Sequence, residues 1–302
     1  MKPPVEIVEV GPRDGLQSQS TILDTETKLE LVSRLVAAGV RRIEAASFVN
    51  PKRVPQMADA DAVVAGLPRV PGLRYIGLVL NEQGVERALA SGIEQLNCAV
   101  ASSATFCGRN QGSTPERMQA LIADLVPRVK AAGRFFGVTV ATAFGCPFEG
   151  EIDPLRVRDL VQHLVDCGID EIALADTIGV AVPSEVSRML DLVQPVLQGT
   201  SLRLHFHDTR NTAVANVCAA LAAGVRIFDA SVGGLGGCPF APGATGNVAS
   251  EDLLYLFERM GYDAGISLAA LVDAAHWLEG PLGAKLPAAV SRASPFPPVQ
   301  LA

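Results

Sequence analysis

The sequence has little of what a secreted or nucleic-acid-binding protein needs. Its 302 residues include six cysteines, but no two of them form a Cys-x-x-Cys pair, and nothing else indicates an oxidising compartment or a secretory signal. It has only five lysines and a net charge of −7. Nucleic acid is excluded as a partner, because neutralising its phosphates requires a basic face. We therefore expect a cytoplasmic protein.

Long apolar helices are also lacking. The longest stretch without a charge, residues 230–250, is about as long as a membrane span. Six glycines and two prolines interrupt it, and both residue types are poor in helix interiors. This stretch is therefore predicted to be a loop, and we expect no association with a membrane. Hydrophobic residues nevertheless make up 49% of the chain and charged residues 19%, which allows a large core.

Short apolar, β-branched runs alternate with longer segments of helical period along the chain, which predicts repeated strand–helix units. Strands are expected at residues 5–10, 42–46, 73–78, 95–100, 136–142, 171–175, 202–207 and 227–232. Helices are expected at residues 25–38, 54–66, 82–91, 115–131, 154–167, 183–197, 212–223 and 250–260.

Eight such units within about 260 residues favour a closed barrel over an open sheet. We predict the α/β class and a single (β/α)8 TIM barrel with a short C-terminal helical extension. The catalytic barrel is expected to span residues 1–265. Residues 266–302 are expected to form a helix over 268–278 and a proline-rich tail from residue 287, mobile or packed on the barrel exterior.

Two histidines on one predicted strand are the strongest functional feature. Strand alternation places His205 and His207 on the same face, while Phe206 points the other way. In a barrel the carboxyl ends of the strands gather the active site, so both imidazoles would project into its mouth. Such a pair is either a structural feature or part of a metal site.

A six-coordinate site for Mg²⁺ or Mn²⁺ would need oxygen donors beside the two imidazoles. Asp14 and Asn247 are the candidates, because strands 1 and 8 adjoin strand 7 in a closed barrel. The alternatives are a turn residue or a salt bridge with Arg13 for Asp14, and a place before a helix for Asn247. For Asp176, which follows strand 6, helix capping or structural hydrogen bonding competes with a catalytic role.

Cys238 follows two glycines and precedes a proline within the uncharged run. This position on a flexible loop favours a reactive thiol more than the positions of the other five cysteines do, although reactivity depends on the pKa of the thiol. The glycines of the same run lack the spacing of a phosphate-binding loop.

Several motifs together resemble the 3-hydroxy-3-methylglutaryl-CoA lyases, over about residues 5–265. The glycine-rich cysteine loop is the most specific of them. The matching segments are 5–17 (VEIVEVGPRDGLQ), 43–57 with its Ser-Phe-Val and Val-Pro-Gln-Met runs, 145–150 (GCPFEG), 176–179 (DTIG), 205–209 (HFHDT), 234–239 (GLGGCP) and 243–247 (GATGN).

The resemblance implies that Asp14, His205, His207 and Asn247 hold a divalent cation, Mg²⁺ or Mn²⁺. It further implies that Arg13 and Cys238 are catalytic and that Glu44 and Asp176 support the site. An acyl-CoA substrate and a homo-oligomer, a dimer in this family, are also implied. Lys52, Arg109 and Asn110 are candidate CoA contacts, and the alternative for any one of them is solvated surface.

The implied reaction is a retro-Claisen cleavage of 3-hydroxy-3-methylglutaryl-CoA to acetyl-CoA and acetoacetate. The cation would lower the pKa of the C3 hydroxyl, and Asp14 or His205 would take its proton. Arg13 would stabilise negative charge on the thioester oxygen. Cys238, on a loop that could close over the site, would protonate the enolate carbon.

Departures from the family pattern concern the substrate. Arg210-Asn211-Thr212 replace the usual Tyr-Gly-Gln, and Ala104 replaces a carboxylate, so Arg210 could bind a second carboxylate or a different branch. Three alternatives therefore remain. The first is cleavage of a related branched 3-hydroxyacyl-CoA such as citramalyl-CoA, the second is a Claisen-condensing acyltransferase, and the third is a barrel that binds CoA esters without turnover.

Overall fold

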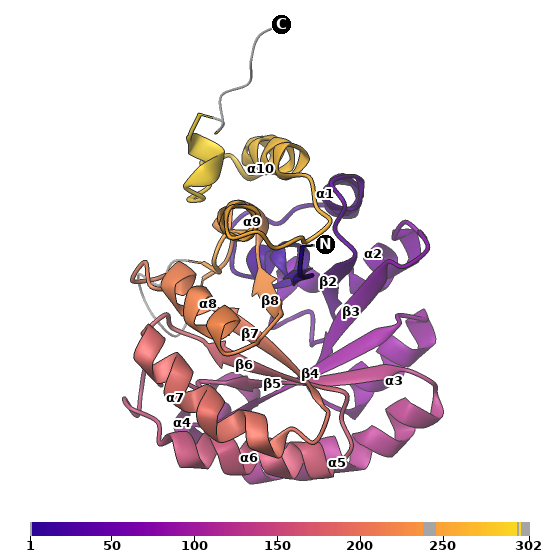
Figure 1. The fold of residues 1–302 in the computed structure, drawn as a ribbon. Coiled ribbons are helices and arrows are strands. Elements are labelled where there is room, and N and C mark those ends of the chain that lie inside the picture. The colour runs from indigo at the N-terminus through magenta and orange to yellow at the C-terminus, as the bar shows by residue number, and fades with distance from the viewer. Residues whose placement is uncertain (1, 238–245, 295, 297–302) are drawn as a thin grey trace, which may run out of the picture.

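A computed structural model describes residues 2–237, 246–294 and 296. Its eight strands are parallel and form a closed barrel in the order β1 to β8, which confirms the predicted fold (Figure 1). Each predicted strand overlaps an observed one. The strands are β1 (Glu6–Glu9), β2 (Arg42–Ser47), β3 (Arg74–Val79), β4 (Gln95–Ala101), β5 (Phe135–Ala141), β6 (Glu171–Asp176), β7 (Ser201–Phe206) and β8 (Ile227–Ala230).

Helices surround the barrel, and most of them were predicted within a few residues. In the described part of the chain they are α1 (Thr25–Ala37), α2 (Ala60–Gly66), α3 (Glu82–Ser91), α4 (Ala104–Gln111), α5 (Pro115–Ala131), α6 (Pro154–Asp166), α7 (Pro183–Val193), α8 (Ala213–Ala222), α9 (Ser250–Arg259) and α10 (Leu268–Leu282). Short helical turns are η1 (Gly11–Gly15), η2 (Pro55–Met57), η3 (Gln194–Val196), η4 (Val232–Gly234) and η5 (Val290–Arg292).

One helix prediction was wrong in its start, and one helix was missed. The helix expected from residue 54 begins only at Ala60, because Pro55 keeps Val54 out of the helical conformation and residues 55–57 form the separate turn η2. Helix α4 was not predicted at all. It buries only Phe106 and Cys107, so it has no apolar stripe to mark it, although Ser103 caps its first turn through a hydrogen bond from the Phe106 N–H.

The C-terminal segment packs on the outside of the barrel. Figure 1 shows α10 beside α1, and buried side chains of α10 such as Leu271 and Leu278 belong to the main hydrophobic cluster. Further on, the Ala288 N–H donates to the carbonyl of Gly233, and η5 follows. Of the two expectations for this segment, packing on the exterior therefore holds as far as residue 294.

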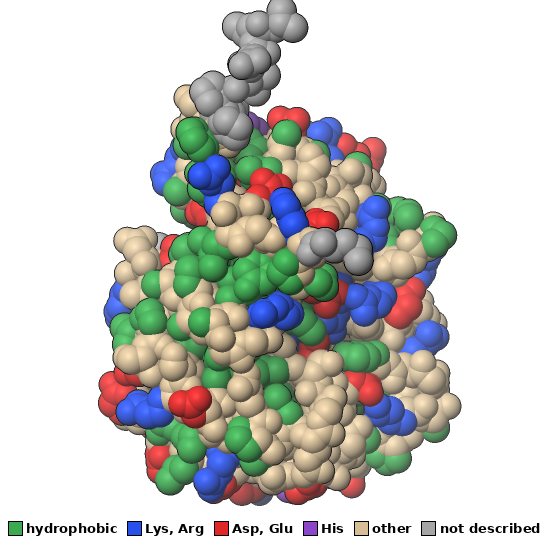
Figure 2. All heavy atoms as spheres, viewed as in Figure 1, with side chains coloured by type: hydrophobic (Ala, Val, Ile, Leu, Met, Phe, Trp, Pro, Cys, Tyr) green, Lys and Arg blue, Asp and Glu red, His purple; other side chains and the backbone are tan. Residues whose placement is uncertain are grey.

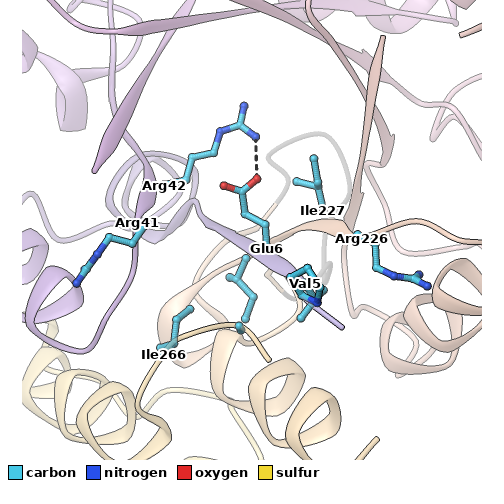
Figure 3. Close-up of a pocket in the computed structure, with 10 residues that line it drawn as sticks. Val5, Glu6, Arg41, Arg42, Arg226, Ile227 and Ile266 are labelled. Atoms are coloured by element: carbon cyan, nitrogen blue, oxygen red, sulfur yellow. Dashed lines mark ion pairs between the residues drawn. The ribbon is translucent and has the colours of Figure 1, made fainter. Parts of the chain in front are cut away.

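None of the helices in the described ranges is long and apolar enough to cross a bilayer. On the face shown in Figure 2, acidic and basic side chains are interspersed among apolar ones. The carboxyl ends of the strands, where the predicted site residues lie, form one end of the barrel. A cavity of about 340 Å³ lies at the opposite end and is lined by residues that include Glu6, Arg42 and Ile227 (Figure 3).

Candidate active site

The turn η1 holds Arg13 and Asp14 at the carboxyl end of β1. The backbone N–H groups of Arg13, Asp14 and Gly15 all point to the carbonyl of Val10, at 3.2, 2.8 and 3.2 Å. This tight π-helical turn presents two adjacent charged side chains at the mouth of the barrel. Short π-helical turns are frequent at functional sites.

His205 and His207 lie where strand alternation predicts, with ring centroids 5.1 Å apart. The chain after β8 returns to pair with the end of β7, and a bridge joins His207 to Asn247. Gly246 makes this return possible, because a Cβ there would overlap the backbone of Gly234 and Gly236. Residues far apart in the sequence thus meet at one point.

Asp14, His205 and His207 form a group that could hold a metal ion, with their ligand atoms all within 4.8 Å of one another. The Asn247 Nδ2 donates to Asp14 Oδ2 at 2.8 Å and to the Leu235 carbonyl at 3.2 Å. The Asn247 Oδ1 and the His207 Nδ1 are buried and have no hydrogen-bond partner among the described residues. An amide oxygen and an imidazole nitrogen without hydrogen-bond partners, beside a carboxylate, are ligand atoms that suit Mg²⁺ or Mn²⁺.

The charges within this group shift its pKa values. Burial would raise the pKa of Asp14, but Arg13 and the two histidines outweigh it and lower the pKa to about 2. Burial and the neighbouring His205 lower the pKa of His207 to about 4. Burial would lower the pKa of His205, but its hydrogen bond to Asp229 raises it above the usual value. Asp14 and His207 are therefore held in the forms that bind metals, an ionised carboxylate and a neutral imidazole.

Arg13 joins Asp14 to Glu44. Its Nη1 donates to Asp14 Oδ1 at 2.7 Å, and its Nε donates to Glu44 Oε2 at 2.8 Å, with a further contact from Nη2 to the same oxygen. Glu44 is 1% exposed and its Oε1 has no partner in the described structure. Arg13 is therefore a fixed cation at the edge of the metal-binding group. This arrangement suits a cation that stabilises an oxyanion.

The carboxylate of Asp176 binds the backbone of the loop that follows β6. Its two carboxylate oxygens accept hydrogen bonds from the N–H groups of Val180 and Ala181, at 3.0 and 2.9 Å. Burial raises its pKa above the usual value. This bonding matches the structural alternative stated for Asp176, and it places the carboxylate in support of the loop rather than among the metal-binding atoms.

The candidate CoA contacts lie on the loops and helices at the carboxyl end of the barrel. Lys52 is exposed in the turn after β2, and Arg109 and Asn110 are exposed on α4. The guanidinium of Arg109 stacks 4.1 Å from the ring centroid of Phe148. Arg210 donates to the carbonyls of Ile178 and Gly179, so its cation is held by a loop.

Cys238 lies outside the described residues. The chain is described again from Gly246, and the flanking segments 235–237 and 246–249 lie next to the metal-binding group through the contacts of Asn247. The role assigned to Cys238 therefore stays a prediction.

Several buried carboxylates at this end of the barrel were missed, and two of them contact His205 or the turn η1 of the candidate site. Asp229 on β8 contacts His205, and Glu9 at the end of β1 accepts hydrogen bonds from the Gly11 and Val232 N–H groups and from the Ser250 hydroxyl. A charged residue within an apolar strand was the available signal for both. Glu9 ties the turn η1 to η4 and to the start of α9.

Glu9 gives a testable dependence of stability on pH. Burial raises its pKa from 4.5 to about 7, so the folded protein keeps a proton that the unfolded chain releases above pH 4.5. Stability from this group is fully present below pH 4.5 and is lost as pH rises through 7. Glu9→Gln should remove up to roughly 3 kcal/mol of this pH dependence.

Urea unfolding of the wild type and of Glu9→Gln at several pH values between 5 and 8 would measure this effect. The side-chain amide in this variant can accept the two backbone hydrogen bonds through its oxygen and donate to the Ser250 hydroxyl. The substitution therefore preserves the packing around position 9. Glu258→Gln, at an exposed position on α9, is the matched control. If the free energy of unfolding changed with pH equally in the wild type and in Glu9→Gln, the prediction would be contradicted.

Comparison with known proteins shows one family over nearly the whole chain. The sequence model of the HMGL-like family matches residues 4–278. The chain is 43% identical to the (R)-citramalyl-CoA lyase of Chloroflexus aurantiacus over 304 aligned positions, covering 97% of this chain and 96% of that protein. It is 42% identical to the hydroxymethylglutaryl-CoA lyase of Pseudomonas mevalonii, covering 92% and 93%.

A solved structure gives the same fold. The HMG-CoA lyase from Acinetobacter baumannii, in complex with coenzyme A and 3-methylmalate, superposes with a TM-score of 0.94 at 40% identity. The match covers 97% of this chain and 96% of that one.

Proposed function

Because this chain belongs to the HMGL-like family of carbon–carbon lyases, we propose that it cleaves a branched 3-hydroxyacyl-CoA in a divalent-metal-dependent retro-Claisen reaction. One observation carries the proposal, the group of Asp14, His205 and His207 with the cation of Arg13 beside it. These residues stand at the end of the barrel where catalytic side chains gather.

The metal ligands in this proposal are Asp14, His205, His207 and the Oδ1 of Asn247. When bound, a divalent cation supplies positive charge that favours ionisation of the substrate hydroxyl. Asp14 and His205 lie side by side and are the two candidate acceptors of that proton, although His205 can take it only while its Nε2 is free of the metal. Glu44 holds Arg13 so that its guanidinium lies beside Asp14.

In the cleavage step the electrons of the alkoxide form the carbonyl of the product ketone, and the bond between C2 and C3 breaks. Its electron pair forms the enolate of acetyl-CoA, whose oxygen we assign to Arg13. The Cys238 thiol then gives its proton to the enolate carbon. Atoms and charge balance, because the proton taken from the hydroxyl remains on the protein base.

3-Hydroxy-3-methylglutaryl-CoA, which yields acetyl-CoA and acetoacetate, is the substrate we propose. Citramalyl-CoA is the second candidate, favoured by the 43% identity to a protein named as its lyase. It is one methylene shorter, and its cleavage yields pyruvate in place of acetoacetate. Arg210 donates through its Nη1 to backbone carbonyls, and its contact with a second carboxylate of the substrate stays a prediction.

A panel assay tests the function. The purified protein with Mg²⁺ or Mn²⁺ is incubated with branched 3-hydroxyacyl-CoA esters, and acetyl-CoA is followed together with acetoacetate and pyruvate. Acetoacetate release supports the first substrate, and pyruvate release supports the second. Cleavage of none of the esters, with condensation of acetyl-CoA and a 2-oxo acid instead, would overturn the lyase assignment.

The role of Cys238 has its own test. Cys238→Ala is expected to lower kcat by about 10²- to 10⁴-fold, the usual range for loss of a general acid, while Mn²⁺ still binds. Cys218→Ala, at a half-buried position on α8, is the control and should keep full activity. Full activity of Cys238→Ala in a steady-state assay would remove it as the proton donor.

We also propose a ligand class, a compartment and an oligomeric state. An acyl-CoA ligand is supported by the coenzyme A bound to the Acinetobacter relative, and Lys52, Arg109 and Asn110 are its proposed contacts. Five free thiols among the described residues are consistent with a reducing compartment such as the cytoplasm. The homodimer and the division at residue 265 stay predictions.

A further inference from the structure

Acidic and basic side chains that contact one another in turn form a chain of charges through the interior of the barrel, starting at the amino-terminal ends of the strands. There the carboxylate of Glu6 faces Arg42 at 3.5 Å (Figure 3). Arg42 donates to both oxygens of Glu171, at 2.7 and 2.9 Å, and the Nε of Arg203 donates to the same carboxylate at 2.9 Å. Arg42, Glu171 and Arg203 are at most 3% exposed, so these charges stabilise one another in place of water.

Asp229 is the last carboxylate of this chain of charges and connects it to the metal-binding group. The Nη1 of Arg203 donates to Asp229 Oδ1 at 2.6 Å, while Asp229 Oδ2 lies 3.0 Å from the Nδ1 of His205. Neighbouring positions of β7 and β8 bring His205 and Asp229 together. Each oxygen of Asp229 therefore has a separate partner, and a permanent cation holds the carboxylate in place.

This contact decides which nitrogen of His205 carries the proton. A carboxylate beside an arginine only accepts hydrogen bonds, so the Nδ1 of His205 must be the donor. The neutral imidazole then has its free electron pair on Nε2. His207 differs, because its Nδ1 has no partner in the part of the chain that the structure describes.

We propose that Asp229, held by Arg203, is a positioning residue that fixes the orientation and tautomer of His205 and thereby sets the affinity for the metal. The proposal rests on the proposed function in that it takes His205 as a ligand. Carboxylates that orient metal-binding histidines in this way typically contribute about 10- to 100-fold to metal affinity.

Asp229→Asn is the informative substitution. The guanidinium of Arg203 can only donate hydrogen bonds, so it keeps its bond to the oxygen of the new amide. The NH₂ group of the amide then faces the Nδ1 of His205. That nitrogen must then accept, which moves the imidazole proton to Nε2 and blocks the electron pair that would bind the metal. We expect the Mn²⁺ affinity, measured by electron paramagnetic resonance, to fall about 10- to 100-fold.

Glu171→Gln is the matched control. It removes a carboxylate from the same buried chain of charges but does not touch His205. If the buried chain of charges had a purely structural role, Glu171→Gln and Asp229→Asn would lower the metal affinity of the folded protein alike. We expect Glu171→Gln to keep its Mn²⁺ affinity within about threefold, well below the effect of losing a ligand-orienting group. Equal affinities of Asp229→Asn and the wild type would overturn the proposal.

A second measurement needs neither metal nor a folded variant of Asp229. The chain has four histidines, so long-range ¹⁵N–¹H spectra of the metal-free wild type at alkaline pH can be assigned with single substitutions of His163, His207 and His276. We expect His205 in the Nδ1–H form, and the Nε2–H form would overturn the proposal. A wild type that binds no Mn²⁺ would instead overturn the proposed metal dependence, and the tautomer would still be measured.

Discussion

Replacing His207 by alanine is expected to abolish metal-dependent cleavage and to lower the Mn²⁺ affinity by more than about 100-fold, because losing a ligand costs more than losing an outer-shell contact. His207 is 4% exposed and stands within ligand distance of Asp14 and His205. Its lowered pKa, about 4, keeps the imidazole neutral and free to bind a metal at neutral pH.

Metal titration of the chelator-treated protein and an acetyl-CoA release assay would measure both effects. His163→Ala is the matched control, since His163 is an exposed histidine on α6. It should change neither quantity. An unchanged metal content in His207→Ala would contradict the ligand assignment, whatever the activity.

Glu171→Gln is expected to lower the free energy of unfolding by about 3–5 kcal/mol, the usual cost of removing one partner from a buried ion pair. Glu171 is 1% exposed and accepts hydrogen bonds from two buried guanidinium groups, those of Arg42 and Arg203. The neutral amide leaves two positive charges inside the barrel with less compensation, and water cannot replace the lost charge there.

Urea unfolding would measure this loss. The matched control is Glu86→Gln, which removes a carboxylate from an exposed pair with Arg128 at 3.2 Å. Exposed pairs are worth at most about 1 kcal/mol, so the control should stay close to the wild type. A similarly small change for Glu171→Gln would mean that the buried chain of charges contributes little to stability.

The barrel was predictable because its strands and helices carry strong, local patterns. The apolar runs around residues 95–100 and 171–175 and the helical periods between them mark strand–helix units without reference to the rest of the chain. Helix α4 was missed because it buries only two side chains. The start of α2 was placed too early because the apolar period runs through residues 54–59, whereas Val54 is non-helical before Pro55 and residues 55–57 form the separate turn η2.

The candidate site was predictable in part. Period-two alternation placed His205 and His207 on one face, and the adjacency of strands 1, 7 and 8 in a closed barrel made Asp14 and Asn247 candidates, which the resemblance to a known family then implied as ligands. The same alternation extends back to Arg203, and it would also have singled out Asp229 as a charge on an apolar strand. These two residues were not predicted because the interior of a barrel is usually filled by apolar side chains, so the pattern of one strand does not show that a charge there has a partner.

The sequence by itself determined the eightfold alternation, the pair of histidines and the glycine-rich loop, since each depends on residues close together along the chain. Only the tertiary structure decided the contacts between distant strands. Among these, Asp229 holds the imidazole of His205, the two oxygens of Asp176 bind the loop backbone, and the cation of Arg210 binds carbonyls. Hydrogen bonds depend on distance and direction at the scale of ångströms, and closure of the barrel sets both.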